Sequence, residues 1–143
     1  MVRDIEIKDK VEWEKLYCGY ADFYKVEITE EIINTVWHWL HDLKHELNGL
    51  VYEIDNHIVA IAHYRQMPSP LRGKNIGFLD DLFVHPDFRG RKIAEDIINK
   101  LNEISKERGW GLIRWITRND NHRAKSLYDR VANKSTWEVY ELD

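Results

Sequence analysis

One stretch, residues 78–94, constrains the fold more than any other because it joins a strand pattern to a helix pattern through a short basic loop. The strand pattern ends at Pro86, and apolar residues then recur at helical spacing over residues 90–108. A further strand pattern covers residues 112–117. A strand, a helix and a strand in this order form a right-handed crossover, so the two strands are predicted to be parallel neighbours in one sheet.

The rest of the chain adds further helices and mainly antiparallel strands. Strands are predicted at residues 2–7, 50–54, 58–64, 76–84, 112–117 and 137–142, and helices at residues 13–24, 30–47, 90–108 and 121–131, with residues 67–74 as the longest loop. We therefore expect one domain, residues 1–143, with an α/β (α+β) fold. Its central sheet should be mixed and mostly antiparallel, with one parallel strand pair and about four flanking helices.

The loop between the parallel strand and its helix has the composition of an anion site. Free backbone N–H groups and a partial positive charge at a helix N-terminus attract phosphate. The sequence Arg-Gly-Arg-Lys at 89–92 adds side-chain charge and a glycine that lets the backbone come close to a ligand. Just upstream, Asp80 and Asp81 should point to opposite faces of the strand, because side chains alternate. One of them could therefore face a substrate while the loop holds an anionic cofactor.

The formal net charge of −4 hides a division of charge along the chain. Residues 88–134 hold 12 basic and 6 acidic side chains, whereas residues 1–47 hold 6 basic and 11 acidic ones. This division suggests an anionic partner near the loop and a cationic partner near the acidic first third of the chain. The alternative is that the charges on the helices only interact with solvent.

Other features limit the classes of function. No apolar run approaches the length of a membrane span and no export signal is recognisable, so a soluble, cytoplasmic protein is expected. Cys18 is the one cysteine, which fits a reducing compartment. His41 and His45 share a helix face, but no zinc-protease Glu accompanies them, so no metal is expected. The six Trp residues fit core packing better than base stacking, and nucleic-acid binding is not expected.

Three motifs resemble the GNAT superfamily of acyl-CoA-dependent N-acyltransferases, and the resemblance covers essentially the whole chain. Residues 89–94 fit the loop motif Q/R-x-x-G-x-G/A at its first and last positions, but Lys92 replaces the middle glycine. The stretch FLDDLFVHP precedes this loop, and Asn121-x-x-Ala124-x-x-x-Tyr128 follows the next strand. The N-terminal aromatic pattern that begins at Trp13 is similar, more narrowly, to the branch that acetylates histone tails and polyamines.

The resemblance implies the GNAT fold and acetyl-CoA as a co-substrate, with the parallel strand pair at the acetyl-CoA site. It assigns cofactor binding to Leu82, Phe83, Val84, Arg89, Gly90, Arg91, Lys92, Ile93, Ala94, Asn121, Ala124 and Tyr128. The predicted last strand, residues 137–142, can pair or exchange between protomers, so a homodimer is expected.

The reaction itself requires a deprotonated amine, donors for an oxyanion and a proton for the leaving thiolate. Asp80 matches the position of the acidic residue that deprotonates the amine in polyamine-acetylating relatives, with Asp81 as the second candidate. Alternatively, both are solvated charges at a strand edge. Tyr128 matches the family's general acid, although it shares an apolar stripe with Ala124 and Val131 and could simply pack in the core. Backbone N–H groups of residues 82–84 are expected to bind the oxyanion.

The acceptor is expected to be a primary amine on a cationic molecule, such as a polyamine or a lysine side chain. In this superfamily the first two helices form one wall of the acceptor site, so substrate contacts are expected at Asp22, Tyr24, Glu27 and Asp81. The main alternative is a catalytically silent domain that binds or senses acyl-CoA, in which Lys92 has altered the loop. A nucleotide-binding domain is a weaker alternative, because no G-K-[ST] loop is present.

Overall fold

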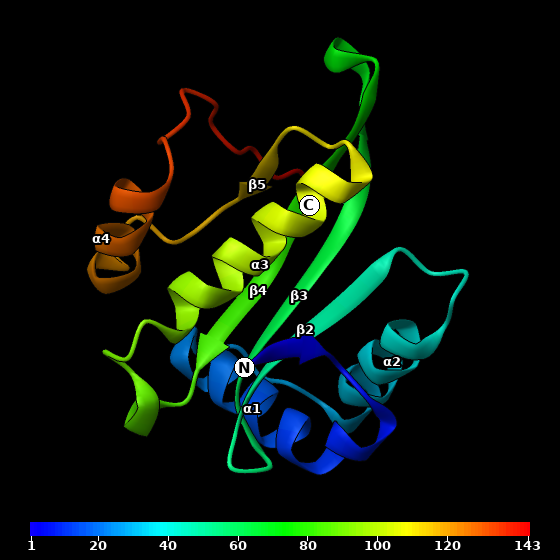
Figure 1. The fold of residues 1–143 in the computed structure, drawn as a ribbon, viewed down its shortest axis with the longest axis vertical. Helices are drawn as coiled ribbons and strands as arrows, with labels where there is room; N and C mark the ends of the chain where they lie inside the picture. The colour runs from blue at the N-terminus through cyan, green and yellow to red at the C-terminus, as the bar shows by residue number, and fades with distance from the viewer.

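The computed structural model describes residues 1–143 and contains a five-stranded sheet and four α-helices (Figure 1). The strands are β1 (Val2–Asp4), β2 (Leu47–Ile54), β3 (His57–Ser69), β4 (Lys74–Val84) and β5 (Ile113–Trp115), and the α-helices are α1 (Lys10–Phe23), α2 (Glu30–His41), α3 (Ile93–Arg108) and α4 (His122–Val131). The strand order is β1-β2-β3-β4-β5, and every neighbouring pair is antiparallel except β4 and β5. This confirms the predicted α+β fold with one parallel pair.

Helix α3 forms the crossover between the two parallel strands and covers one face of the sheet (Figure 1). Its buried side chains recur every three or four residues and pack against β3 and β4: Ile93, Ile97, Leu101 and Ile104. The helix ends at Gly109, whose φ of 68° is the left-handed conformation that glycine adopts most easily.

Helices α1 and α2 build a second core with the other face of the sheet. Trp13 and Leu16 of α1 pack with Ile33 and Val36 of α2 and with Ile61 of β3. Neighbouring residues of β3 belong to the first core, so its side chains alternate between the two layers. Strands β3 and β4 therefore run through the middle of the molecule, covered on both sides.

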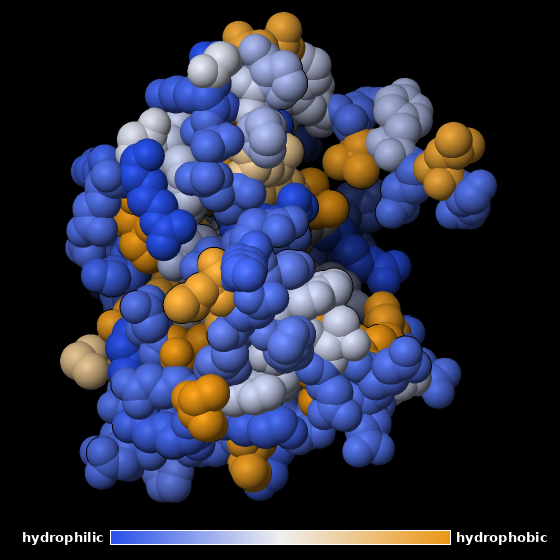
Figure 2. All heavy atoms as spheres, turned by 90° about the vertical axis from the view of Figure 1, so that its right-hand side faces the viewer, coloured by the Kyte–Doolittle hydropathy of each residue, from blue (hydrophilic) through white to orange (hydrophobic).

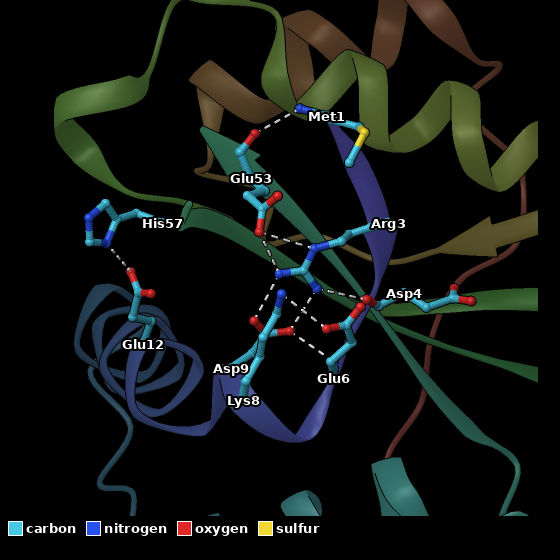
Figure 3. Close-up of polar contacts among 9 residues, drawn as sticks. All are labelled: Met1, Arg3, Asp4, Glu6, Lys8, Asp9, Glu12, Glu53 and His57. Carbon is cyan, nitrogen blue, oxygen red and sulfur yellow. Dashed lines mark hydrogen bonds and ion pairs between the residues drawn. The ribbon is translucent and has the colours of Figure 1, made fainter. Parts of the chain in front are cut away.

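A charged cluster fastens the N-terminus to the sheet (Figure 3). Arg3 of β1 donates to both carboxylate oxygens of Asp9 at 2.8 and 2.9 Å and to Glu53 of β2 at 2.9 Å. Burial alone would raise the pKa of the Asp9 carboxyl, but the hydrogen bonds from Arg3 and from the Glu6 backbone lower it overall. The cluster therefore holds the start of α1 against β2.

The hairpin between β2 and β3 turns at two residues, one fewer than the three, 55–57, that separate the predicted strands. Asp55 and Asn56 both have positive φ, at 50° and 65°, and Asp and Asn tolerate that conformation better than most residues. The predicted loop at residues 67–74 was wrong in extent, because β3 and β4 continue through it. Met67 pairs with Ile76 and Ser69 with Lys74, which leaves a short turn around Pro70–Arg72.

The predicted last strand at residues 137–142 was also wrong, since this segment forms neither strand nor helix. A strand exists only when a neighbour pairs with it, and the tail has no such partner within this chain. Its apolar side chains are exposed, including Trp137 at 68% and Tyr140 at 88%.

The surface is mainly hydrophilic, in keeping with a mean hydropathy of −0.57. Figure 2 shows one face on which hydrophobic residues form scattered patches among hydrophilic ones. None of the helices combines the length and the apolar character needed to cross a bilayer.

Candidate active site

A cavity of about 400 Å³ opens where the C-terminal end of β4, the N-terminus of α3 and helix α4 meet. Of the twelve residues predicted to bind a cofactor, eleven line it: Leu82, Phe83, Val84, Arg89, Gly90, Lys92, Ile93, Ala94, Asn121, Ala124 and Tyr128. Arg91 does not, and its guanidinium carbon lies 5.0 Å from the centre of the Phe88 ring instead. We call this space the first cavity.

The backbone at the mouth of the first cavity leaves N–H groups available. Lys92 precedes α3 with no side-chain cap, and the first-turn N–H groups of a helix have no partner within it. Lys92 has a φ of 62°, the left-handed region in which a glycine would be unstrained. The replacement of the family's glycine therefore keeps the glycine-like backbone conformation and adds a positive charge beside the helix N-terminus.

The cations of the first cavity come from both sides of it. Arg89 donates from Nε to the Val84 carbonyl at 3.3 Å and lies near the rings of Phe23 and Phe83. Burial, with a smaller contribution from Arg123, lowers the pKa of the Arg89 guanidinium. Arg123 of α4 lines the same cavity and was missed from the sequence, where nothing marks it out among the arginines of that region.

Helix α4 places Tyr128 on the wall of the first cavity. Tyr128 is half-buried and meets Trp115 edge to face, with ring centroids 5.3 Å apart. Burial, together with the nearby Tyr24, raises the pKa of the Tyr128 phenol to about 12. The hydroxyl group is therefore protonated throughout the neutral range and can act as a hydrogen-bond donor or an acid.

Asn121 caps α4 and connects it to α1. Its side-chain oxygen accepts from the Ala124 N–H at 3.4 Å, and its Nδ2 donates to the Tyr24 hydroxyl at 3.3 Å. Tyr24 was expected among the acceptor contacts. It lines the first cavity, together with the residues predicted to bind the cofactor.

A second cavity, of about 410 Å³, lies beside the middle of β4. Its lining combines aromatic side chains with carboxylates: Tyr17, Val36, Trp39, His45, Glu46, Leu47, Arg65, Asp80 and Asp81. The ring of His45 stacks on that of Trp39, with an interplanar angle of 6° and centroids 4.7 Å apart. Trp39 and Glu46 were not predicted for the site, because only the tertiary fold brings α2 and the loop after it to the same cavity as Asp80 and Asp81.

Both Asp80 and Asp81 face the second cavity, so the prediction that they point to opposite faces was wrong. The reason is a β-bulge. His63 pairs with Asp81 and the next residue, Tyr64, pairs with Leu79, which leaves Asp80 as an extra residue in β4. The bulge interrupts the alternation of side chains and brings the two carboxylates to one side.

The two carboxylates have different partners. Asp80 accepts from Arg65 Nε, at 3.2 Å for Oδ1 and 3.0 Å for Oδ2, yet burial outweighs this contact and raises the pKa of the Asp80 carboxyl. Asp81 lies 2.8 Å from Nδ1 of the buried His63. Asp80 is therefore more basic than an ordinary aspartate, and Asp81 is held by a buried side chain.

Two of the residues predicted to contact the acceptor line neither cavity. These are Asp22 and Glu27, and both are exposed. The carboxylates that line the second cavity are those of Asp80, Asp81 and Glu46.

Comparison with known proteins adds four findings. Residues 13–132 match the acetyltransferase (GNAT) family. The chain is 29% identical to a D-amino-acid N-acetyltransferase of Saccharomyces cerevisiae, over 99% of this chain and 89% of the relative. A thialysine N-epsilon-acetyltransferase of Bos taurus is 34% identical, but the match covers 57% of this chain and only 48% of the relative. A crystal structure of a ribosomal-protein-alanine N-acetyltransferase from Brucella melitensis has the same fold, with a TM-score of 0.84, 23% identity and coverage of 100% of this chain and 97% of that one.

Proposed function

The chain belongs to the GNAT family of acetyltransferases, and on this premise we propose that it transfers the acetyl group of acetyl-CoA to a primary amine on a cationic acceptor. As a member it is an acyl-CoA-dependent N-acetyltransferase. One observation carries the proposal: strand β4 contributes to both cavities, with residues 82–84 in the basic first cavity and Asp80 and Asp81 in the acidic second one. A basic site for the cofactor and an acidic site for the amine thus adjoin along one strand.

Acetyl-CoA is proposed to occupy the first cavity, with its phosphates at residues 89–94. Arg89, Lys92 and Arg123 supply positive charge there, and α3 supplies free N–H groups. Strand β5 pairs with β4 only as far as Leu79, so the β5-facing edge of residues 80–84 has no strand partner. Its backbone groups are available to the pantetheine arm and, at residues 82–84, to the oxyanion.

The proposed reaction assigns each proton transfer to a group. Asp80 takes a proton from the acceptor ammonium, and the neutral amine attacks the thioester carbonyl to form the C–N bond. The oxyanion collapses, the C–S bond breaks, and Tyr128 protonates the thiolate and regains its proton from solvent. The second proton on nitrogen leaves to solvent as the amide forms. Burial in the first cavity raises the pKa of the leaving thiol as well as that of the Tyr128 phenol. The difference between the two pKa values therefore stays small enough for proton transfer.

Replacing Arg89 by Ala is expected to weaken acetyl-CoA binding by about 1–3 kcal/mol, because a charge-assisted contact to phosphate is lost. Titration calorimetry with acetyl-CoA measures this effect. Arg72→Ala, at an exposed position outside both cavities, is the matched control and should bind normally. Unchanged affinity in folded Arg89→Ala would show that the phosphates bind elsewhere.

The second cavity supports a cationic acceptor such as a polyamine or a lysine side chain. Three carboxylates line it against one arginine, and the stacked pair Trp39 and His45 offers a flat surface for an alkyl chain or an ammonium group. Both relatives named above are N-acetyltransferases, which agrees with an amine as the acceptor.

We expect kcat/KM to be higher for spermidine than for a monoamine of similar length, and salt to reduce this preference. Charges attract a polycation more strongly than a monocation, and ions screen that attraction. Steady-state rates for both amines at low and high salt test it, with Glu46→Gln as the variant that should also reduce the preference. Equal kcat/KM for the two amines at low salt would refute the role of charge.

We also propose a homodimer that works in a reducing compartment such as the cytoplasm, where the single free Cys18 would be stable. The exposed alternation of Trp137, Val139 and other apolar side chains in the tail favours strand pairing with a second copy. Light scattering is expected to give twice the chain mass of 17.2 kDa, and Val139→Asp is expected to shift the protein towards monomer. A monomer at micromolar concentration would contradict this proposal.

A further inference from the structure

A fully buried histidine connects the core to the acidic cavity. His63 of β3 is 1% exposed and lies between α1 and β4. The indole Nε1 of Trp13, which is itself 0% exposed, donates to His63 Nε2 at 2.9 Å. On the other side of the ring, His63 Nδ1 lies 2.8 Å from Asp81 Oδ2. The reaction described above makes no use of this histidine.

The two contacts define the protonation of the imidazole ring. An indole N–H can only donate, so Nε2 of His63 must accept and carries no proton. The ring's one proton is then on Nδ1, where it is donated to the Asp81 carboxylate. Trp13 thus fixes the tautomer, and the tautomer fixes the orientation of Asp81.

We propose that His63 is a positioning residue for the acceptor amine: it holds Asp81, through a tautomer that Trp13 enforces, as the ionised anchor for the acceptor's ammonium group. The proposal rests on the proposed function. In this arrangement Asp80 takes the proton, while Asp81 binds the ammonium and directs its nitrogen towards the first cavity. A neutral imidazole suits this role, because a cationic one would neutralise the charge that attracts the amine.

The surroundings of His63 distinguish this role from core packing alone. Its neighbours on β3 from Ile58 to Ala62 are all apolar, so an apolar residue would fit the layer without the need for two hydrogen bonds. Three titratable groups lie close to the ring: Tyr17 on α1, and Asp80 and Asp81 on β4. Two further groups lie beside these carboxylates, Tyr20 near Asp81 and Arg65 against Asp80. Burial and the Asp81 charge raise the pKa of both tyrosines, so neither competes for a proton at neutral pH.

The test compares two replacements of His63 in the full chain, with acetyl-CoA and spermidine as substrates. His63→Leu removes the donor at similar volume, whereas His63→Asn keeps an N–H near the position of Nδ1. We expect His63→Leu to raise KM for spermidine about tenfold, by analogy with the effect of losing the hydrogen-bond partner of a metal ligand, with acetyl-CoA affinity unchanged. We expect His63→Asn to restore most of the loss. Equal KM values in Leu, Asn and wild type, or equal losses in both variants, would overturn the proposal.

A third measurement gives a readout that packing cannot mimic. Nitrogen NMR of wild type at neutral pH should show His63 protonated on Nδ1 and not on Nε2, because Nε2 accepts from Trp13. Trp13→Phe removes that donor, so it should weaken this tautomer preference and raise KM for spermidine. An Nε2–H tautomer in wild type, or an unchanged KM in folded Trp13→Phe, would overturn the proposal. Absence of wild-type turnover with spermidine would instead reject the acceptor class, while the NMR spectrum still decides the tautomer.

Discussion

Tyr128→Phe is expected to lower kcat by about 10²–10⁴-fold, the usual contribution of a positioned general acid. The phenyl ring keeps the edge-to-face contact with Trp115, so the fold and acetyl-CoA affinity should change little. What is lost is the hydroxyl proton, which a phenol with a pKa of about 12 retains across the neutral range. Because the hydroxyl does not ionise below that pH, no alkaline loss of wild-type activity from Tyr128 is expected between pH 6 and 9.

Single-turnover rates with saturating acetyl-CoA measure this effect on the chemical step. Tyr140→Phe, in the exposed tail, is the matched control and should keep the wild-type rate. Near-normal turnover in Tyr128→Phe would assign Tyr128 to packing, the alternative that its position on the apolar stripe of α4 favours.

Asp80→Asn is expected to lower kcat by a similar factor of about 10²–10⁴, because the acceptor ammonium loses its proton acceptor. The raised pKa of the Asp80 carboxyl has a defined consequence in wild type: the carboxylate must be ionised to act, so activity should fall on the acid side at a pH above the ordinary aspartate range. In Asp80→Asn the fall in activity caused by protonation of this carboxyl should be absent. The much lower residual rate should instead rise steadily with pH, as solvent deprotonates more of the amine.

Asp81→Asn provides the comparison within the same bulge. If Asp81 anchors the ammonium, its replacement should mainly raise KM for spermidine and leave kcat closer to wild type. If Asp81→Asn instead loses kcat and Asp80→Asn raises KM, then Asp81 is the proton acceptor and Asp80 anchors the ammonium. Kinetics of both variants over pH 6 to 9 decide between the assignments.

The parts of the fold that depend on local pattern were predictable from the sequence. The apolar spacing of α3 and the basic loop before it indicated the crossover, and Asp55-Asn56 indicated the turn of the hairpin. The errors involve partners distant in sequence. Strands β3 and β4 extend through residues 67–74 because each supplies the other's hydrogen bonds, and residues 137–142 form no strand because no neighbour does.

Prediction of the candidate site was limited in the same way, by partners distant in sequence. Motif positions identified eleven residues of one cavity, because each motif is a short continuous segment: the end of β4, the loop and start of α3, and helix α4 with its cap. The second cavity collects residues from α1, α2, the loop before β2, and strands β2, β3 and β4. Its two β4 carboxylates, Asp80 and Asp81, share a side only because of the bulge at Asp80. A bulge depends on cross-strand register, which alternation within one strand does not reveal. For the same reason nothing in the sequence indicated that Glu46 would share a cavity with these carboxylates.

The most direct test of the account is to incubate the full chain with acetyl-CoA and spermidine, then follow free thiol and the mass of the amine. The account predicts thiol release that depends on spermidine, with one acetyl group added to the amine for each thiol released. Tight binding of acetyl-CoA without thiol release on spermidine or on lysine peptides would contradict it and would favour a domain that senses acyl-CoA.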